Sequence, residues 1–225
     1  MTRARTVAAP CIALVAAAVY ALTWVGYSHG WHWQQRLDWS LLYAARGSAV
    51  KHPFWVRFWA DVSFALGPVP LRALGAVAAA CALVARRVRA GLLLLACAPL
   101  SGLVTAAAKS LVDRPRPSTM LVAAAETSFP SGHALEATAA LLAALSLVSP
   151  TMNRAMRRVA VALVALSVLA VGASRVALNV HYPSDVVAGW SLGYLYFLLC
   201  YTVIRPPRAT FARKRCDAAD LVTAR

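Results

Sequence analysis

The sequence predicts an all-α integral membrane protein with six transmembrane helices and an interfacial segment between the first two. Three observations support this fold class. Of the 225 residues, 60% are hydrophobic and only 14% are charged, whereas about a quarter are charged in an average soluble domain. The chain contains apolar runs of roughly 20 residues, the length a helix needs to cross a bilayer core of about 30 Å. Most basic residues stand between these runs, as they do at the ends of membrane helices.

The apolar runs place the predicted spans at residues 7–25, 65–85, 91–109, 132–149, 159–178 and 184–204. The first run is longer than the apolar core of about 7–15 residues in a signal peptide, so we expect a retained helix. Gly67, Pro68 and Pro70 predict an irregular start to the second span. Residues 1–204 are expected to form one membrane domain, followed by a basic cytoplasmic tail at residues 205–225.

Residues 29–61 carry five of the seven tryptophans together with Arg36, Asp38, Arg46, Lys51 and Arg57. This segment is too charged to be read as a span. Tryptophan concentrates at the headgroup level of a membrane, and helices of mixed apolar and basic character lie in the interface. We therefore expect an interfacial, Trp-rich segment, with a packed cap outside the membrane as the alternative.

The net charge of +15 has two readings, nucleic-acid binding and the marking of cytoplasmic helix ends. The second is favoured because the basic residues are dispersed between the spans, so we expect no nucleic-acid partner. A cytoplasmic N-terminus places fourteen of the 23 Lys and Arg residues on the cytoplasmic side. The charge pattern predicts a multi-pass protein of the cell (plasma) membrane with both termini in the cytoplasm.

Three polar segments lie at the predicted outer ends of spans: residues 109–117 (KSLVDRPRP), 130–133 (PSGH) and 174–185 (SRVALNVHYPSD). In this order they resemble the three-part signature of the type 2 phosphatidic acid phosphatase superfamily, which reads Lys-x6-Arg-Pro, Pro-Ser-Gly-His and Ser-Arg-x5-His-x3-Asp. All eleven specified positions match. The matching motifs lie within residues 109–185, and the arrangement of six predicted spans also resembles the family.

Elementary chemistry agrees with a phosphate site at these segments. A phosphoryl group in transfer spreads negative charge over three oxygens, which positioned cations and N–H donors stabilise. Arg116 and Arg175 offer planar forks for such oxygens, and Lys109 offers a point charge. Ser131 and Gly132 begin the fourth predicted span, where backbone N–H groups and the helix dipole favour an anion.

The resemblance implies distinct roles for the two motif histidines. His181 is expected to attack phosphorus and form a phosphohistidine, with Asp185 holding the other ring nitrogen and stabilising the developing positive charge. His133 is expected to protonate the leaving oxygen and then to activate water, as one acid–base group can in both half-reactions.

Four further features bear on the site. Glu136, one helical turn after His133, could face the site or satisfy a polar contact. Asp113 and Arg114 lie inside the first motif without belonging to it and could pair with each other. The cysteines show no pairing or metal-binding pattern. The carboxylates are too few and scattered for a two-metal phosphatase, so we expect no metal and no cofactor.

The sequence thus predicts a metal-independent lipid phosphate phosphatase whose site faces away from the cytoplasm. Polyprenyl diphosphates or phosphates and phosphatidate-type lipids are the expected substrates, and the bilayer is the only other predicted partner, with no indication of oligomeric state. A lipid phosphotransferase with the same site is the first alternative, and an anion-conducting transporter is the second. A soluble vanadate-dependent haloperoxidase, which shares the constellation, is disfavoured by the six spans.

Overall fold

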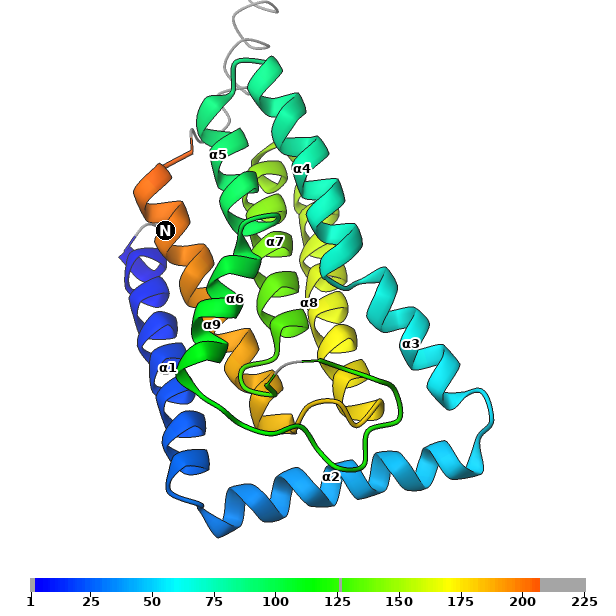
Figure 1. The fold of residues 1–225 in the computed structure, drawn as a ribbon. Coiled ribbons are helices and arrows are strands. Elements are labelled where there is room, and N and C mark those ends of the chain that lie inside the picture. Colours follow the sequence, from blue (N-terminus) through cyan, green and yellow to red (C-terminus); the bar gives the residue numbers. More distant parts are fainter. Residues whose placement is uncertain (1–2, 126, 207–225) are drawn as a thin grey trace, which may run out of the picture.

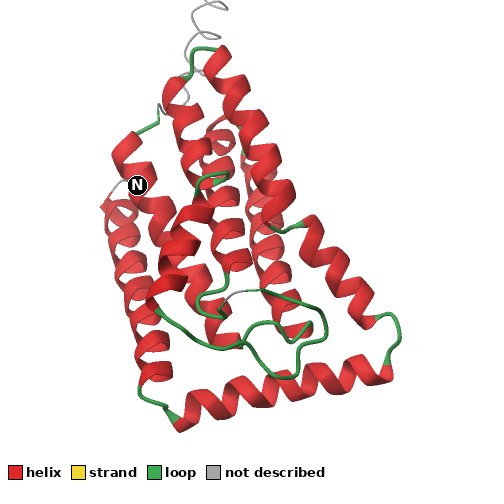
Figure 2. Cartoon of the chain, viewed as in Figure 1, coloured by secondary structure: helices red, strands yellow, loops and turns green. Residues whose placement is uncertain are grey.

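The computed structural model describes residues 3–125 and 127–206, and within them every regular element is helical (Figure 2). The elements are α1 (Arg3–Ser28), α2 (His32–Lys51), α3 (Trp55–Ala65), α4 (Pro68–Val84), α5 (Val88–Cys97), α6 (Ser101–Leu111), α7 (Gly132–Val148), the short 3₁₀ helix η1 (Ser149–Thr151), α8 (Arg154–Ala177) and α9 (Pro183–Ile204). The all-α prediction is confirmed.

Six helical segments of the described residues are long and apolar enough to cross a membrane: Pro10–Ser28, Trp55–Val84, Val88–Leu111, Gly132–Thr151, Arg154–Ala177 and Pro183–Ile204. Two of them are interrupted. The second is interrupted between α3 and α4 next to Gly67 and Pro68; irregularity was predicted there, but at the start of the span and not inside it. The third breaks between α5 and α6 at Pro99, which the sequence prediction did not anticipate. Proline breaks a helix because it lacks an N–H donor and clashes with the preceding turn.

Many large apolar side chains on these helices point outward rather than into the bundle. Leu14 on α1, Leu163 on α8 and Val203 on α9 are 72%, 59% and 72% exposed. Water disfavours such a surface, because each exposed apolar side chain forgoes burial worth roughly 1.5–3 kcal/mol. Lipid tails accommodate it, so the chain is a multi-pass membrane protein.

The helices α7 and α9 form the most extensive contact in the bundle. Two glycines on α9 allow it: a Cβ on Gly189 would collide with the carbonyl oxygen of Ser131, and one on Gly193 with that of Leu135. Small residues at this spacing of four let two membrane helices approach through their backbones. The close approach brings the N-terminal ends of α7 and α9 together.

Figure 1 shows α2 lying across one end of the bundle, beneath the loop of residues 112–131 that joins α6 to α7. The N-terminal end of α1 and the C-terminal end of α9 lie toward the opposite end of the bundle. The Trp-rich segment is therefore divided. Its first part forms α2, but Trp55 and Trp59 fall in α3, which belongs to the second span. The interfacial part is thus shorter than predicted because the second span begins ten residues earlier than expected.

A buried charge cluster fixes α2 to the bundle. Arg114 Nη2 donates to Asp38 Oδ2 on α2 at 2.8 Å, and its Nη1 donates to Asp185 Oδ1 on α9 at 2.5 Å. Asp38 also accepts from the N–H and hydroxyl of Ser184 at 2.9 and 2.6 Å. The suggested pairing of Arg114 with Asp113 is replaced by a different one, because folding brings the buried carboxylates of Asp38 and Asp185 to Arg114.

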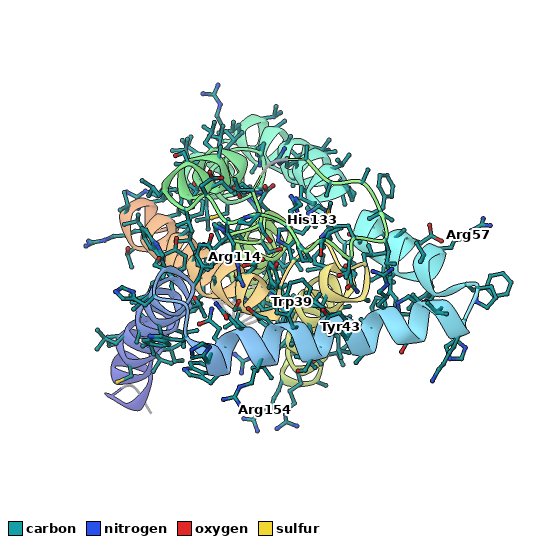
Figure 3. All side chains as sticks on the ribbon, turned by 60° about the horizontal axis from the view of Figure 1, so that its bottom comes forward. Trp39, Tyr43, Arg57, Arg114, His133 and Arg154 are labelled. Atoms are coloured by element: carbon teal, nitrogen blue, oxygen red, sulfur yellow. The ribbon has the colours of Figure 1, made fainter. Side chains whose placement is uncertain are left out.

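The guanidinium of Arg114 also stacks over the ring of Tyr182, 3.9 Å from its centre. Figure 3, seen from the end that α2 covers, shows Arg114 in the interior, whereas Arg57 points away from the molecule. Of the predicted basic tail, only Arg205 and Pro206 lie within the described residues, so the structure leaves that prediction untested.

We predict that Arg114→Met lowers stability by about 3–5 kcal/mol, because it leaves the carboxylates of Asp38 and Asp185 buried without their shared cation. The measurement is the thermal unfolding midpoint of the purified protein in detergent. Arg57→Met is the matched control, since Arg57 is exposed, and it should leave the midpoint unchanged. Equal midpoints for the two variants would contradict the role of the cluster.

Candidate active site

A cavity of about 460 Å³ lies between α4, α6, α7 and the loop of residues 112–131. Six of the eight predicted site residues line it: Lys109, Arg116, Gly132, His133, Arg175 and His181. The other two, Ser131 and Asp185, are fully buried next to this wall. The three sequence segments are thus brought to one place.

His181 lies in the short connection between α8 and α9 and is 2% exposed. Its Nε2 is 3.1 Å from Arg116 Nη1 on the cavity side. Its Nδ1 is 3.6 Å from Asp185 Oδ2, which is longer than a hydrogen bond. Ser128 stands between them, with its hydroxyl donating to Asp185 Oδ2 and lying 3.5 Å from Nδ1. The predicted His–Asp pair is present, with a serine beside it that the sequence prediction missed.

Local backbone structure positions Asp185. Asn179 adopts a left-handed conformation with φ of 55°, which asparagine tolerates well, and this reverses the chain after α8. Pro183 then occupies the first turn of α9, where its missing N–H costs nothing. Asp185 Oδ2 accepts from the N–H of Tyr182 at 2.9 Å, as in a capping box. The carboxylate is therefore held beside the His181 ring.

Burial lowers the pKa of His181, and so do the charges of Arg175 and Arg116. Asp185 opposes these effects only in part, and the resulting pKa is about 4. The ring is therefore neutral at pH 7 and keeps a lone pair on one nitrogen. Because Asp185 lies at Nδ1, the arrangement favours the tautomer with its proton there and the lone pair on Nε2, which faces the cavity.

The cations around the cavity are held in place by the main chain and by neighbouring hydroxyls. Arg116 donates to the carbonyl oxygen of Ala125 at 3.0 and 2.7 Å, and to that of Val180 at 2.8 Å. The ammonium of Lys109 donates to the carbonyl oxygen of Thr127. These contacts join the loop of residues 112–131 to α6 and to the turn after α8. The positively charged ends of the two side chains are therefore held in fixed positions at the cavity.

Arg175 reaches the cavity from the last turn of α8. Its Nη1 donates to Ser63 Oγ on α3 at 2.6 Å. Its Nε is buried and has no hydrogen-bond partner among the described residues. A buried donor of this kind favours an acceptor such as a phosphate oxygen, because an unmet hydrogen bond in the interior is costly.

The N-terminus of α7 forms another part of the wall. Ser131 is its N-cap residue, and the Ser131 N–H donates to the carbonyl oxygen of Asp185 at 3.0 Å. Gly132 follows at the first helical position, where a Cβ would lie 2.7 Å from Thr105 Cγ2. Glycine thus permits close packing here, and the first-turn N–H groups give this end of α7 its affinity for an anion.

His133 faces the same cavity from the first turn of α7 (Figure 3). One edge of its ring lies against the junction of α3 and α4, where a Cβ on Gly67 would come within 3.3 Å of Nε2. The two histidines therefore border one space from different segments, His133 from α7 and His181 from the α8–α9 connection, an arrangement suited to a nucleophile and a separate proton donor.

The structure also brings in residues that sequence reasoning missed or left open. Arg72 on α4 and Glu136 on α7 form a two-pronged ion pair on the cavity wall. Ser128, Arg114 and Asp38 support Asp185 from outside the cavity. Asp38 carried a signal, as one of two carboxylates in the mainly basic Trp-rich segment of residues 29–61, but its partner Arg114 lies 76 residues away. In the described part of the chain, no group of three or more His, Cys, Asp or Glu side chains could hold a metal ion.

Comparison with known proteins identifies the family. Residues 90–208 match the PAP2 superfamily. A 113-residue segment is 37% identical to phosphatidylglycerophosphatase B of Bacillus subtilis (strain 168), covering 48% of this chain and 55% of that protein. The chain thus spans about half the length of this curated relative.

The fold matches the crystal structure of the first transmembrane PAP2 type phosphatidylglycerolphosphate phosphatase from Bacillus subtilis, with a TM-score of 0.73 and 24% identity. That match covers 90% of this chain and 98% of the other. The family match extends over more than half of the sequence and includes the residues of all three motifs. The chain belongs to the PAP2 superfamily.

Proposed function

We propose that this protein is a lipid phosphate phosphatase that works through a phosphohistidine at His181. The observation that carries the proposal is that one cavity is bordered by both histidines, His181 and His133, and by three cationic side chains. These are Lys109, Arg116 and Arg175. Membership in the PAP2 superfamily and the similarity to a phosphatidylglycerophosphatase support it.

In the first half-reaction, His181 Nε2 attacks the phosphorus of the substrate while the bond from phosphorus to the leaving oxygen breaks. The neutral ring supplies the electron pair, and Asp185 stabilises the positive charge that develops on the imidazole. His133 donates a proton to the leaving oxygen, which departs as a lipid alcohol or a lipid phosphate.

In the second half-reaction, His133 accepts a proton from water, and the water oxygen attacks the phosphorus. The N–P bond of the phosphohistidine breaks, inorganic phosphate leaves and His181 returns to its neutral form. Throughout, Arg116, Arg175 and Lys109 stabilise the three equatorial oxygens together with the N-terminus of α7. Transfer to a lipid alcohol instead of water would make a phosphotransferase, so release of inorganic phosphate is the deciding measurement.

The site is proposed to face away from the cytoplasm. The cavity lies toward the end of the bundle that α2 covers, and the described chain ends lie toward the other (Figure 1). Fourteen of the 23 Lys and Arg residues belong to segments at that other end or to the predicted tail, which the positive-inside rule assigns to the cytoplasm. The substrates proposed are lipids with a terminal phosphate, either prenyl diphosphates and phosphates or glycerophospholipids of the phosphatidate type.

His181→Ala is predicted to lower the rate of phosphate release by at least about 10³-fold with every substrate, because the covalent route loses its nucleophile. His133→Ala should lower it by about 10²–10⁴-fold with lipid phosphates. p-Nitrophenyl phosphate should partly restore the His133 variant but not the His181 variant, since nitrophenolate leaves without a proton. Phosphate release by the purified protein is the readout, with exposed His52→Ala as the control. Near-normal turnover by the His181 variant would refute the assignment.

Catalysis is predicted to continue in excess EDTA and to be inhibited by micromolar to millimolar orthovanadate. The cations on the cavity wall supply the positive charge for the phosphoryl oxygens, and vanadate adopts the trigonal-bipyramidal geometry of the group in transfer. The measurement is phosphate release with and without each reagent. Activity that is lost in EDTA and restored by magnesium would contradict this mechanism.

A cysteine at position 118 in the α6–α7 loop should react with a membrane-impermeant maleimide in intact cells, and one at position 151 should react only after lysis. Both positions are exposed in the structure, and the five native cysteines would first be replaced. The reverse labelling pattern would overturn the proposed orientation.

A further inference from the structure

The ion pair between Arg72 and Glu136 lies on the cavity wall but has no role in the reaction described above. Arg72 Nε is 2.7 Å from Glu136 Oε2, and its Nη2 is 2.8 Å from Oε1. The Glu136 side chain is only 4% exposed, whereas that of Arg72 is 43% exposed. The carboxylate is thus a buried anchor, and the guanidinium is the accessible member of the pair.

Neighbouring residues hold this pair in one arrangement. Thr105 Oγ1 donates to Glu136 Oε1 at 3.3 Å. Gly102 on α6 provides the space in which the guanidinium lies, because a Cβ there would collide with Arg72 Nη2. Residues of three helices, α4, α6 and α7, therefore fix the direction of the Arg72 fork.

The pair lies on the side where the leaving group must go. Glu136 is one helical turn after His133 on α7, so the two residues share a face. The His133 ring borders Gly67, and Pro68 and Arg72 follow on α4 along the same cavity. Since His133 protonates the leaving oxygen in the proposed reaction, the group attached to that oxygen extends toward Arg72.

The donor count of Arg72 suits an anion at this position. A guanidinium has five N–H groups, and the contacts to Glu136 use two of them. The remaining three can donate to another acceptor, and Glu136 keeps the fork oriented without an entropic cost on binding. An uncharged alcohol would gain little binding energy from such a cation, whereas phosphate oxygens match the geometry of the guanidinium.

We infer that Arg72, oriented by Glu136, forms a leaving-group subsite that selects lipid diphosphates over lipid monophosphates. This inference rests on the proposed function. With a diphosphate, His181 attacks the terminal phosphorus, the bond from that phosphorus to the bridging oxygen breaks, and a lipid monophosphate leaves. The phosphate of that leaving group accepts hydrogen bonds from Arg72. With a monophosphate, the leaving group is a neutral alcohol, and Arg72 contributes little.

The test compares kcat/KM for farnesyl diphosphate and farnesyl phosphate, which carry the same chain. Arg72→Gln should lower the value for the diphosphate by about 10–100-fold, as expected for loss of a charge-assisted contact. The value for the monophosphate should fall by less than about threefold. Arg72→Lys retains the charge but not the fork and should give an intermediate ratio. Arg57→Gln, at an exposed site, should leave both values unchanged.

If Arg72→Gln lowers kcat/KM equally for both substrates, the pair serves only to join α4 to α7. If the variant changes neither value, the subsite is likewise overturned. A binding measurement separates this outcome from failure of the proposed function. In a His181→Ala background, Arg72→Gln should weaken binding of a non-hydrolysable farnesyl methylenediphosphonate but not of farnesyl phosphonate. If the unmodified protein hydrolyses neither substrate, the proposed function fails, and this binding difference still decides whether the subsite exists.

Discussion

The carboxylate of Asp185 is the interaction on which the rest of the site depends. It accepts hydrogen bonds from the Tyr182 N–H, the Ser128 hydroxyl and Arg114, and it lies beside the ring of His181. These partners come from the α8–α9 turn and from the α6–α7 loop. A fully buried carboxylate is costly unless it is paired and hydrogen-bonded, so this constellation forms only when all of these segments are in place.

Arg114 extends the same constraint to α2, which lies across one end of the bundle. By pairing with Asp38 it joins α2 to Asp185, and Asp38 in turn accepts from the N-terminal turn of α9. The helix that lies across the end of the bundle is therefore connected to the carboxylate beside His181. In the proposed reaction, the position of α2 and the orientation of His181 are parts of one buried network rather than separate features.

In the proposed reaction, charge is distributed so that each side of the phosphoryl group meets a different environment. The cations Lys109, Arg116 and Arg175 gather around the phosphoryl position, whereas Asp185 stays behind the wall and is neutralised by Arg114. Among the described residues that line the cavity, Glu136 is the only carboxylate, and Arg72 pairs with it. Within the described part of the lining, an anionic substrate would therefore meet no uncompensated carboxylate.

The spans and the three motif segments could be predicted from the sequence because both depend on local pattern. Runs of apolar residues mark helices wherever they fold, and Pro115 and Pro117 end a helix in any context. The convergence of six motif residues on one cavity agrees with that prediction. The break at Pro99 and the close approach at Gly189 and Gly193 also carried local signals, which were overlooked.

The partners of the charged residues were decided by the tertiary structure. From the sequence, the neighbour Asp113 was a possible partner for Arg114, but Arg114 pairs with Asp38 and Asp185, which lie 76 and 71 residues away. Arg72 and Glu136 are 64 residues apart and meet only because α4 packs against α7. The sequence determined which residues are charged and which segments are helical, since these follow from side-chain chemistry and local periodicity. Which charges neutralise each other was left to the packing of the helices, because an ion pair depends on distance in space and not on separation along the chain.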